Sequence, residues 1–126
     1  MFSHVVCEQV VLPVFELFDA RVVGSSSPEP SPASLEQAIA RQTNVAPANI
    51  MVTNGATEAI YLIAQCFASR SHLILQPTFA EYADACRIHG TAPQDILALT
   101  PGDRFGSNDA LWLCNPNNPT GTVVPC

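Results

Sequence analysis

The sequence predicts an α/β domain with a mainly parallel sheet that helices cover on both faces. Apolar runs alternate along the 126-residue chain with stretches of helical periodicity. The three strongest runs, at residues 50–52, 73–75 and 110–114, are continuously apolar rather than alternating, as in strands buried on both faces. A chain of this length can bury roughly two-thirds of its unfolded surface, so a core is possible.

The N-terminal part of the chain is expected to lie outside this regular pattern. Residues 10–20 are apolar enough for a short helix, but Pro13 interrupts them. Residues 24–32 contain three prolines and four serines, a composition typical of an extended connector. We therefore divide the chain into an N-terminal arm without an assigned structure, residues 1–27, and a domain at residues 28–126.

A helix is expected directly after this connector. Its inward face carries the residues that recur at helical spacing, Leu35, Ala38, Ile39 and Gln42. Ser31 or Ser34 is the candidate N-cap, because a serine hydroxyl can accept a first-turn N–H. Residues 44–49, which contain Pro47, are expected to form a turn before the first buried strand at residues 50–52.

Helices and strands alternate through the rest of the chain. A helix is expected at residues 58–67, with four residues facing inward, Ile60, Ile63, Ala64 and Phe67. A second helix at residues 80–89 follows the strand at 73–75 and ends at Gly90. The remaining expected segments are a weak strand at 96–99, a polar turn at 103–108, the strand at 110–114 and a short tail at 122–124.

Three loops follow predicted strands, and binding loops of parallel sheets lie at the carboxyl ends of strands. The first, residues 53–57, leads into a helix, and Gly55 permits a tight turn there. The amides of Ala56 and Thr57 then lie at a helix start, where N–H groups can bind an anion such as phosphate. An ordinary N-cap by Thr57 or Asn54 explains the same residues equally well.

The other two loops carry aromatic and amide side chains. In the loop at 77–82, Phe79 and Tyr82 can stack on a planar ligand, or both can be packing residues. The loop Asn-Pro-Asn-Asn-Pro-Thr-Gly at 115–121 combines planar amides with X-Pro bonds that can be cis. A plain surface turn does not need this rigidity, so the third loop is the most specific feature of the chain.

Taken in order, the three loops resemble the cofactor-binding loops of the class I and II aminotransferases, which are fold-type I enzymes that use pyridoxal 5′-phosphate. The sequences of residues 54–59, 77–82 and 115–121 are most similar to those of the histidinol-phosphate aminotransferase branch, which includes the threonine-phosphate decarboxylases. The resemblance covers residues 28–124 and implies part of the large domain of that fold, a three-layer sandwich. It also implies five cofactor-binding residues: Gly55, Ala56 and Thr57 on the phosphate, Phe79 against the pyridine ring and Asn118 on the phenolic oxygen.

The chain contains five arginines and no lysine. It therefore has no side-chain amine for a Schiff base, and we assign it no catalytic residue. Because the family's enzymes are longer, the chain is expected to be a truncated part that ends after the third loop, with doubtful activity on its own. In the full-length family we expect an amino acid or amino-acid phosphate as substrate and a homodimer. The alternatives are a small non-catalytic phosphate-binding module and a non-functional product.

Composition limits the classes of binding partner that the chain is expected to have. The net charge is −6 and the arginines are scattered, which argues against nucleic acid. No apolar stretch is long enough to span a membrane, and we read no metal site and a cytoplasmic location. Cys66, Cys86 and Cys114 are expected to be buried thiols. Four further side chains are expected to have no catalytic role: His72 and His89 at the surface or a helix end, and Glu58 and Glu81 in first helical turns.

Overall fold

The structure, a computed structural model, describes residues 30–100 and 102–124. The chain divides between Thr53 and Asn54 into two compact units, and each is described by itself. The predicted N-terminal arm, its short helix and its boundary with the domain lie outside the described residues, so these remain predictions.

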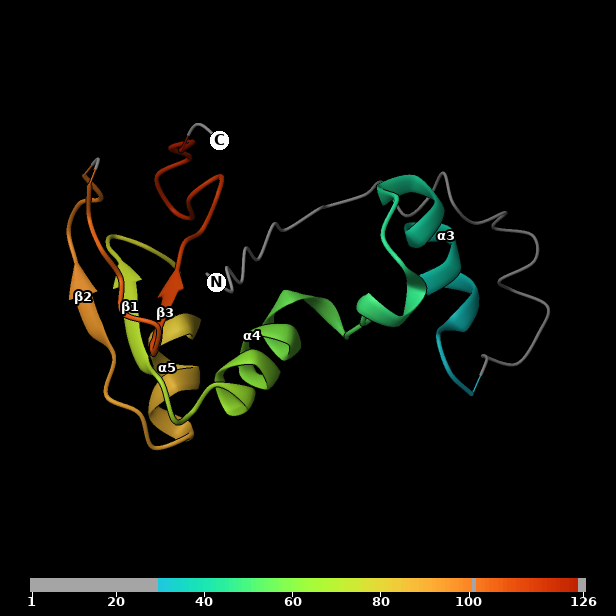
Figure 1. The fold of residues 1–126 in the computed structure, drawn as a ribbon, viewed down its shortest axis with the longest axis horizontal. Helices are drawn as coiled ribbons and strands as arrows, with labels where there is room; N and C mark the ends of the chain where they lie inside the picture. Colours follow the sequence, from blue (N-terminus) through green and yellow to red (C-terminus); the bar gives the residue numbers. More distant parts are fainter. Residues whose placement is uncertain (1–29, 101, 125–126) are drawn as a thin grey trace. The chain divides into compact units, whose positions relative to one another are not determined.

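The unit before Asn54 contains the helix α3, Ala33–Thr43 (Figure 1). Asn44 ends this helix in the left-handed conformation, with φ of 55°, which asparagine tolerates better than most residues. Pro32 occupies the N-cap position and no side chain caps the helix, so the expectation that Ser31 or Ser34 caps it is wrong. Ser31 precedes the N-cap position by one residue and Ser34 follows it by two, so neither occupies the position from which a hydroxyl caps the first-turn amides.

The predicted strand at residues 50–52 is absent from the structure. The 3-10 helix η1, Pro47–Asn49, leads into an extended segment that belongs to no sheet, and Met51 is 61% exposed. A strand exists only where a neighbour satisfies its backbone N–H and C=O groups. The three strands that the structure describes pair with one another, and none pairs with this segment.

The unit from Asn54 onward is built on a three-stranded parallel sheet with the order β2-β1-β3. β1 is Ser71–Leu75, β2 is Gln94–Ile96 and β3 is Asp109–Trp112. The register places Leu73 opposite Gln94 on one side and opposite Leu111 on the other. The parallel sheet is as predicted, and β1 contains the strand expected at 73–75.

The outer strands differ from their predicted bounds. β2 begins two residues before the weak strand expected at 96–99 and ends at Ile96, and Leu97 is 84% exposed. β3 ends at Trp112, two residues before the expected end of its apolar run. Pairing with β1 decides these bounds, because the apolar run continues past the point where the ladder of hydrogen bonds stops.

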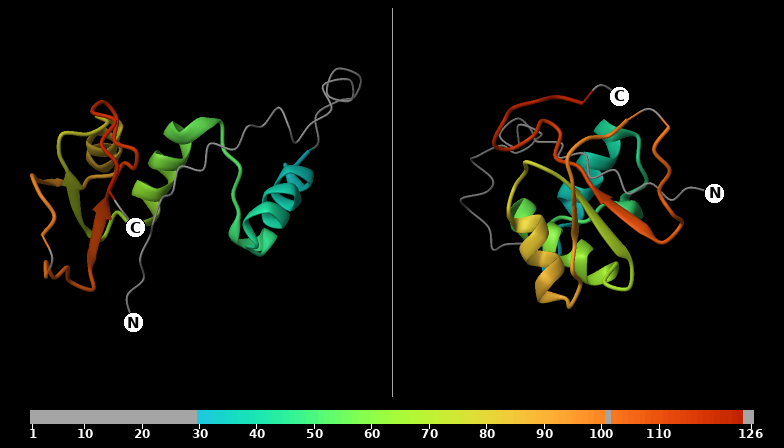
Figure 2. Two further views of the ribbon diagram at one scale, coloured as in Figure 1. Left: turned by 90° about the horizontal axis from the view of Figure 1, so that it is seen from above. Right: turned by 90° about the vertical axis from the view of Figure 1, so that its left-hand side faces the viewer.

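Two helices pack against one face of the sheet, α4, Gly55–Cys66, and α5, Glu81–Ile88 (Figures 1 and 2). β1 alternates accordingly: His72 and Ile74 are buried toward the helices, while Leu73 and Leu75 point to the opposite face and are half-buried. The sheet in the described residues is therefore covered by helices on one face, whereas the continuous apolar runs predicted cover on both.

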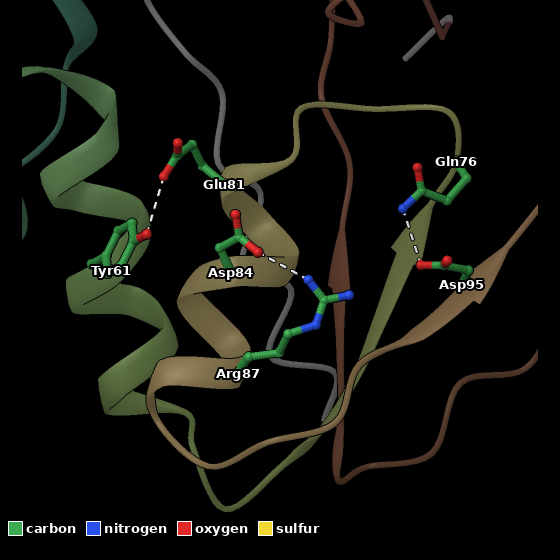
Figure 3. A network of polar contacts seen from close by, with 6 residues as sticks. All are labelled: Tyr61, Gln76, Glu81, Asp84, Arg87 and Asp95. Carbon is green, nitrogen blue, oxygen red and sulfur yellow. Dashed lines mark hydrogen bonds and ion pairs between the residues drawn. The ribbon is translucent and has the colours of Figure 1, made fainter.

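The core joins both helices to the sheet. It contains nine buried residues from α4, α5, β1, β3 and the loop after β3: Ile60, Ala64, Ile74, Tyr82, Ala83, Ala85, Cys86, Trp112 and Cys114. A hydrogen bond from the Tyr61 hydroxyl to the Glu81 carboxylate, 3.1 Å long, also connects α4 with α5 (Figure 3). Gly90, with φ of 79°, follows the end of α5 as predicted.

Two side chains differ in burial from what the sequence predicts. Cys86 and Cys114 are buried as expected, but Cys66 in the last turn of α4 is exposed. His72, expected at the surface or a helix end, is 1% exposed on β1. His89 does follow the last residue of α5. No helix of the described residues is long and apolar enough to cross a membrane.

Candidate functional site

The order of the strands creates a switch point beside β1. The chain leaves β1 toward β2 on one side, and β3 lies on the other side, so the loops after β1 and β3 diverge around a crevice. A cavity of about 200 Å³ lies there. Its walls come from α4, α5 and the loops after β1 and β3, through the residues Ala56, Thr57, Ile60, Phe79, Tyr82, Cys114, Asn115 and Asn118.

The start of α4 presents backbone amides to this cavity. Gly55 is the first residue of the helix and has φ of 78°, a conformation that suits glycine. Ala56 and Thr57 follow in the first turn, where backbone N–H groups have no acceptor within the helix. Glu58 is in the same turn, and its carboxylate accepts a hydrogen bond from the backbone N–H of Asn54 at 2.5 Å. Helix α4 begins at Gly55, three residues before the predicted start at 58.

The aromatic wall of the cavity has a defined geometry. Phe79 is half-buried in the loop after β1 and packs against the core, and Tyr82 in the first turn of α5 is 8% exposed. The two rings meet edge to face, with their centroids 6.2 Å apart and their planes at 88°. Tyr82 is thus both a lining residue and a core residue, and its ring supports the side of Phe79.

The three asparagines of the loop after β3 have different hydrogen bonds. Asn115 exchanges two with Val124, and Asn117 donates to the carbonyl oxygen of Pro77 at 2.8 Å, which ties this loop to the loop after β1. The exposed Asn118 side chain lines the cavity and makes no hydrogen bond to another described residue. The carboxamide of Asn118 is therefore available to a ligand.

Cis peptide bonds occur in both loops, whereas the sequence analysis considered them only for the third loop. They precede Pro77 in the loop after β1 and Pro116 and Pro119 in the loop after β3. The third loop closes on itself through a hydrogen bond from the Gly121 amide to the Asn117 carbonyl oxygen, 2.6 Å long. This closed loop places Asn118 over the cavity.

Four of the five predicted site residues line this one cavity: Ala56, Thr57, Phe79 and Asn118. Gly55 adjoins the cavity through the turn that begins α4 but is not in its wall. Sequence reasoning did not assign Ile60, Cys114 or Asn115 to the site. Helical spacing was the available signal for Ile60, which lies three residues after Thr57 and hence on the same helix face.

No acidic side chain of the described residues lines the cavity. None of the eight lining residues is basic. Burial and the hydrogen bond to Glu81 raise the pKa of Tyr61 on the neighbouring part of α4. At the far side of β1, Gln76 donates a hydrogen bond to Asp95 at 3.0 Å and thereby holds the start of the loop against β2 (Figure 3).

A buried polar pair lies beneath the aromatic wall. The indole N–H of Trp112 donates to Nδ1 of His72 at 2.8 Å, and Nε2 of His72 lies 2.9 Å from the carbonyl oxygen of Phe67. Because an indole N–H can only donate, Nδ1 must be the acceptor, and the ring proton is on Nε2 and donated to Phe67. Trp112 is 40 residues from His72, and Phe67 precedes β1. Neither partner was indicated by the sequence pattern.

Comparison with known proteins places these features in a family context. The family model described as aminotransferase class I and II matches residues 4–126. A histidinol-phosphate aminotransferase of Lactiplantibacillus plantarum is 34% identical over 112 residues, which cover 76% of this chain and 30% of that protein. A putative threonine-phosphate decarboxylase of Caldanaerobacter subterraneus is 38% identical over 101 residues, which cover 71% of this chain and 27% of that protein.

The fold has the same relatives. The crystal structure of L-threonine-O-3-phosphate decarboxylase from Porphyromonas gingivalis matches with a TM-score of 0.70 and 42% identity, over 79% of this chain and 31% of that chain. The present chain thus spans about a third of the length of the curated relatives that it matches.

Proposed function

Because this chain belongs to the class I and II aminotransferase family, we propose that its cavity binds pyridoxal 5′-phosphate. In this proposal the amides of Gly55, Ala56 and Thr57, with the Thr57 hydroxyl, hold the phosphate. The Phe79 ring stacks on the pyridine, and Asn118 donates to the phenolic oxygen. The observation that carries the proposal is the convergence of three segments, far apart in sequence, on one cavity at the switch point of the sheet.

The chemistry of the lining residues fits a flat, phosphorylated aromatic ring. First-turn amides and a hydroxyl suit phosphate oxygens, because a helix start carries partial positive charge. An aromatic face suits a planar ring, and a carboxamide can donate to a ring oxygen. Since no basic side chain lines the cavity, the affinity for phosphate would depend on these neutral donors.

We propose that the substrate of the enzyme to which this chain corresponds is an amino acid or an amino-acid phosphate. The aminotransferase and decarboxylase names of its relatives support both reaction types. Pyridoxal phosphate, when bound, supplies an electron sink for bonds at the α-carbon of such substrates. The described residues of this chain bind and orient that ring. We further propose that the enzyme is a cytoplasmic homodimer of amino-acid biosynthesis.

A second candidate function is binding of a phosphorylated metabolite without catalysis. The observation that favours it is the complete absence of lysine, so that no side-chain amine can react with an aldehyde ligand. This alternative keeps the phosphate site at the start of α4 but gives no role to Phe79 or Asn118.

Equilibrium binding distinguishes the two functions. We expect the full chain to bind pyridoxal phosphate more tightly than inorganic phosphate or unphosphorylated pyridoxal, as measured by calorimetry. Asn118→Ala should weaken pyridoxal phosphate about threefold to tenfold, the equivalent of one hydrogen bond, without changing the affinity for inorganic phosphate. Asn108→Ala is the matched control, because Asn108 is also exposed but precedes β3 at the other end of the sheet.

Equal affinities for pyridoxal phosphate and inorganic phosphate would refute cofactor binding and support the second candidate. Borohydride reduction of the chain mixed with pyridoxal phosphate, followed by peptide mapping, tests the consequence of the missing lysine. We expect no stable adduct at an interior residue, and such an adduct would contradict this expectation.

A further inference from the structure

The aromatic wall of the cavity continues into the core as a series of contacts. Phe79 meets Tyr82 edge to face, and the centroid of Tyr82 lies 5.2 Å from that of Trp112. Trp112 is 6% exposed, and His72, which receives its indole N–H, is 1% exposed. These contacts connect a buried histidine on β1 with the ring at the surface of the cavity.

The hydrogen bonds of His72 fix the orientation of Trp112. Nε2 donates to the carbonyl oxygen of Phe67, which sets the plane of the imidazole, and Nδ1 then accepts from only one direction. The imidazole and indole rings lie nearly parallel, with 25° between their planes. An indole held at one edge by a buried hydrogen bond has little freedom to rotate, and Tyr82 packs on its ring.

We propose that His72 is a positioning residue for the ligand-facing ring of Phe79, acting through Trp112 and Tyr82. The proposal rests on the proposed function, because Phe79 is the ring on which the cofactor would stack. A loosened indole lets Tyr82 shift, and the edge-to-face contact then no longer fixes the angle of Phe79. The start of α4 does not take part in this series of contacts, so the phosphate subsite stays intact.

Packing alone predicts a different outcome from positioning. If the histidine only fills the core, its replacement lowers stability and affects every ligand in proportion to the folded fraction. If it positions Phe79, its replacement weakens the binding of the pyridine ring and spares inorganic phosphate. The ratio of the two affinities therefore separates the two roles.

A matched pair of variants tests the proposal on the full chain. In His72→Asn, the side-chain amide lies near the position of Nδ1, so its oxygen can accept the Trp112 N–H. In His72→Gln, the amide reaches the position of Nε2 and can donate to Phe67, but the acceptor for the indole is lost. Each variant loses one buried hydrogen bond, so their stabilities should fall by similar amounts.

We expect His72→Gln to bind pyridoxal phosphate about fivefold more weakly than the wild type, the equivalent of about one hydrogen bond. Its affinity for inorganic phosphate should not change, and His72→Asn should behave like the wild type toward both ligands. Equal effects of the two variants on the affinity ratio would overturn the proposal. If His72→Gln does not fold, Trp112→Phe takes its place, because it keeps a ring against Tyr82 but has no N–H.

NMR without any cofactor gives an independent answer. The chain has a single tryptophan, so its indole N–H is one resolved signal. We expect fast exchange of this proton and a weaker cross-peak between the Phe79 and Tyr82 rings in His72→Gln, and neither change in His72→Asn. An unchanged cross-peak in His72→Gln would overturn the proposal. Absence of pyridoxal phosphate binding by the wild type would refute the proposed function, and the cross-peak would still decide the role of His72.

Discussion

Replacing Gly55 by alanine should damage both the stability and the ligand affinity of this chain. Gly55 begins α4 with φ of 78°, and a Cβ added there meets no atom within 4 Å. The cost is therefore conformational rather than steric, about 1–2 kcal/mol for an L-residue in the left-handed region. A loss of this size lowers the ratio of folded to unfolded molecules roughly 5–30-fold.

Gly90 provides a control with the same backbone geometry. Its φ is 79°, and an added Cβ also meets nothing within 4 Å. Gly90 follows the end of α5, whereas Tyr82 in the first turn of that helix lines the cavity. Gly90 therefore lies at the end of α5 away from the cavity. Gly55→Ala and Gly90→Ala should therefore lose similar free energies of unfolding, measured by urea titration.

Only Gly55→Ala should weaken ligand binding. Relaxation of the turn moves the amides of Ala56 and Thr57 away from the phosphate, and losing one hydrogen bond to a charged group costs about 1.5–3 kcal/mol. Calorimetry should then show at least about tenfold weaker binding of pyridoxal phosphate and of inorganic phosphate. Equal affinities for the two variants, or wild-type affinity in Gly55→Ala, would refute the role of this helix start.

Three further predictions concern charge and exposure. Glu58→Gln should strengthen binding of inorganic phosphate about twofold to fivefold in calorimetry, because it removes a negative charge from the first turn of α4 while keeping an acceptor oxygen. Cys66 should react with iodoacetamide far faster than Cys86 in peptide mapping, because Cys66 is exposed and burial raises the pKa of the Cys86 thiol. Hydrogen bonds from Thr100 lower the pKa of Asp103, so the turn is stabilised above the ordinary pKa of aspartate and opens as pH falls through the lowered value; an NMR titration of the Thr100 amide should follow it.

Each of these predictions has a contrary outcome. Weaker phosphate binding by Glu58→Gln would mean that the carboxylate organises the site rather than opposing the anion. Equal labelling of Cys66 and Cys86 would contradict the burial of α5 against the sheet. Thr100→Ala removes the hydroxyl donor and keeps the backbone N–H, so the carboxyl of Asp103 should titrate at a higher pH in this variant; an unchanged titration would show that the hydroxyl does not act on it.

Local chemistry accounts for the parts that sequence analysis anticipated. Helical spacing located α3, α4 and α5 to within a few residues, and Gly90 marked the end of α5. The carboxyl ends of the strands predicted at 73–75 and 110–114, together with the start of α4, indicated which three loops would lie near one another. The three loop motifs suggested a shared site, and in the structure Thr57, Phe79 and Asn118 line one cavity.

Where sequence analysis erred, a distant partner decided the outcome. Residues 50–52 have strand composition but no neighbouring strand among the described residues, and Cys66 lies on the outer face of α4 although its helix is apolar. His72 is buried because Trp112, 40 residues away, and Phe67 satisfy its two ring nitrogens. The three asparagines of one loop likewise differ: the side chains of Asn115 and Asn117 hydrogen-bond to other parts of the chain, whereas that of Asn118 makes no hydrogen bond to another described residue.

The sequence by itself determined the alternation of helices and strands, the turn at Gly55, the helix end at Gly90, the family and the missing lysine. These depend on residue type and short-range spacing, which the chain carries in every conformation. The tertiary structure decided which apolar segments pair, which polar groups are buried and which amide stays available to a ligand. A buried donor or acceptor needs a partner, and that partner is chosen by the packing of segments far apart in the sequence.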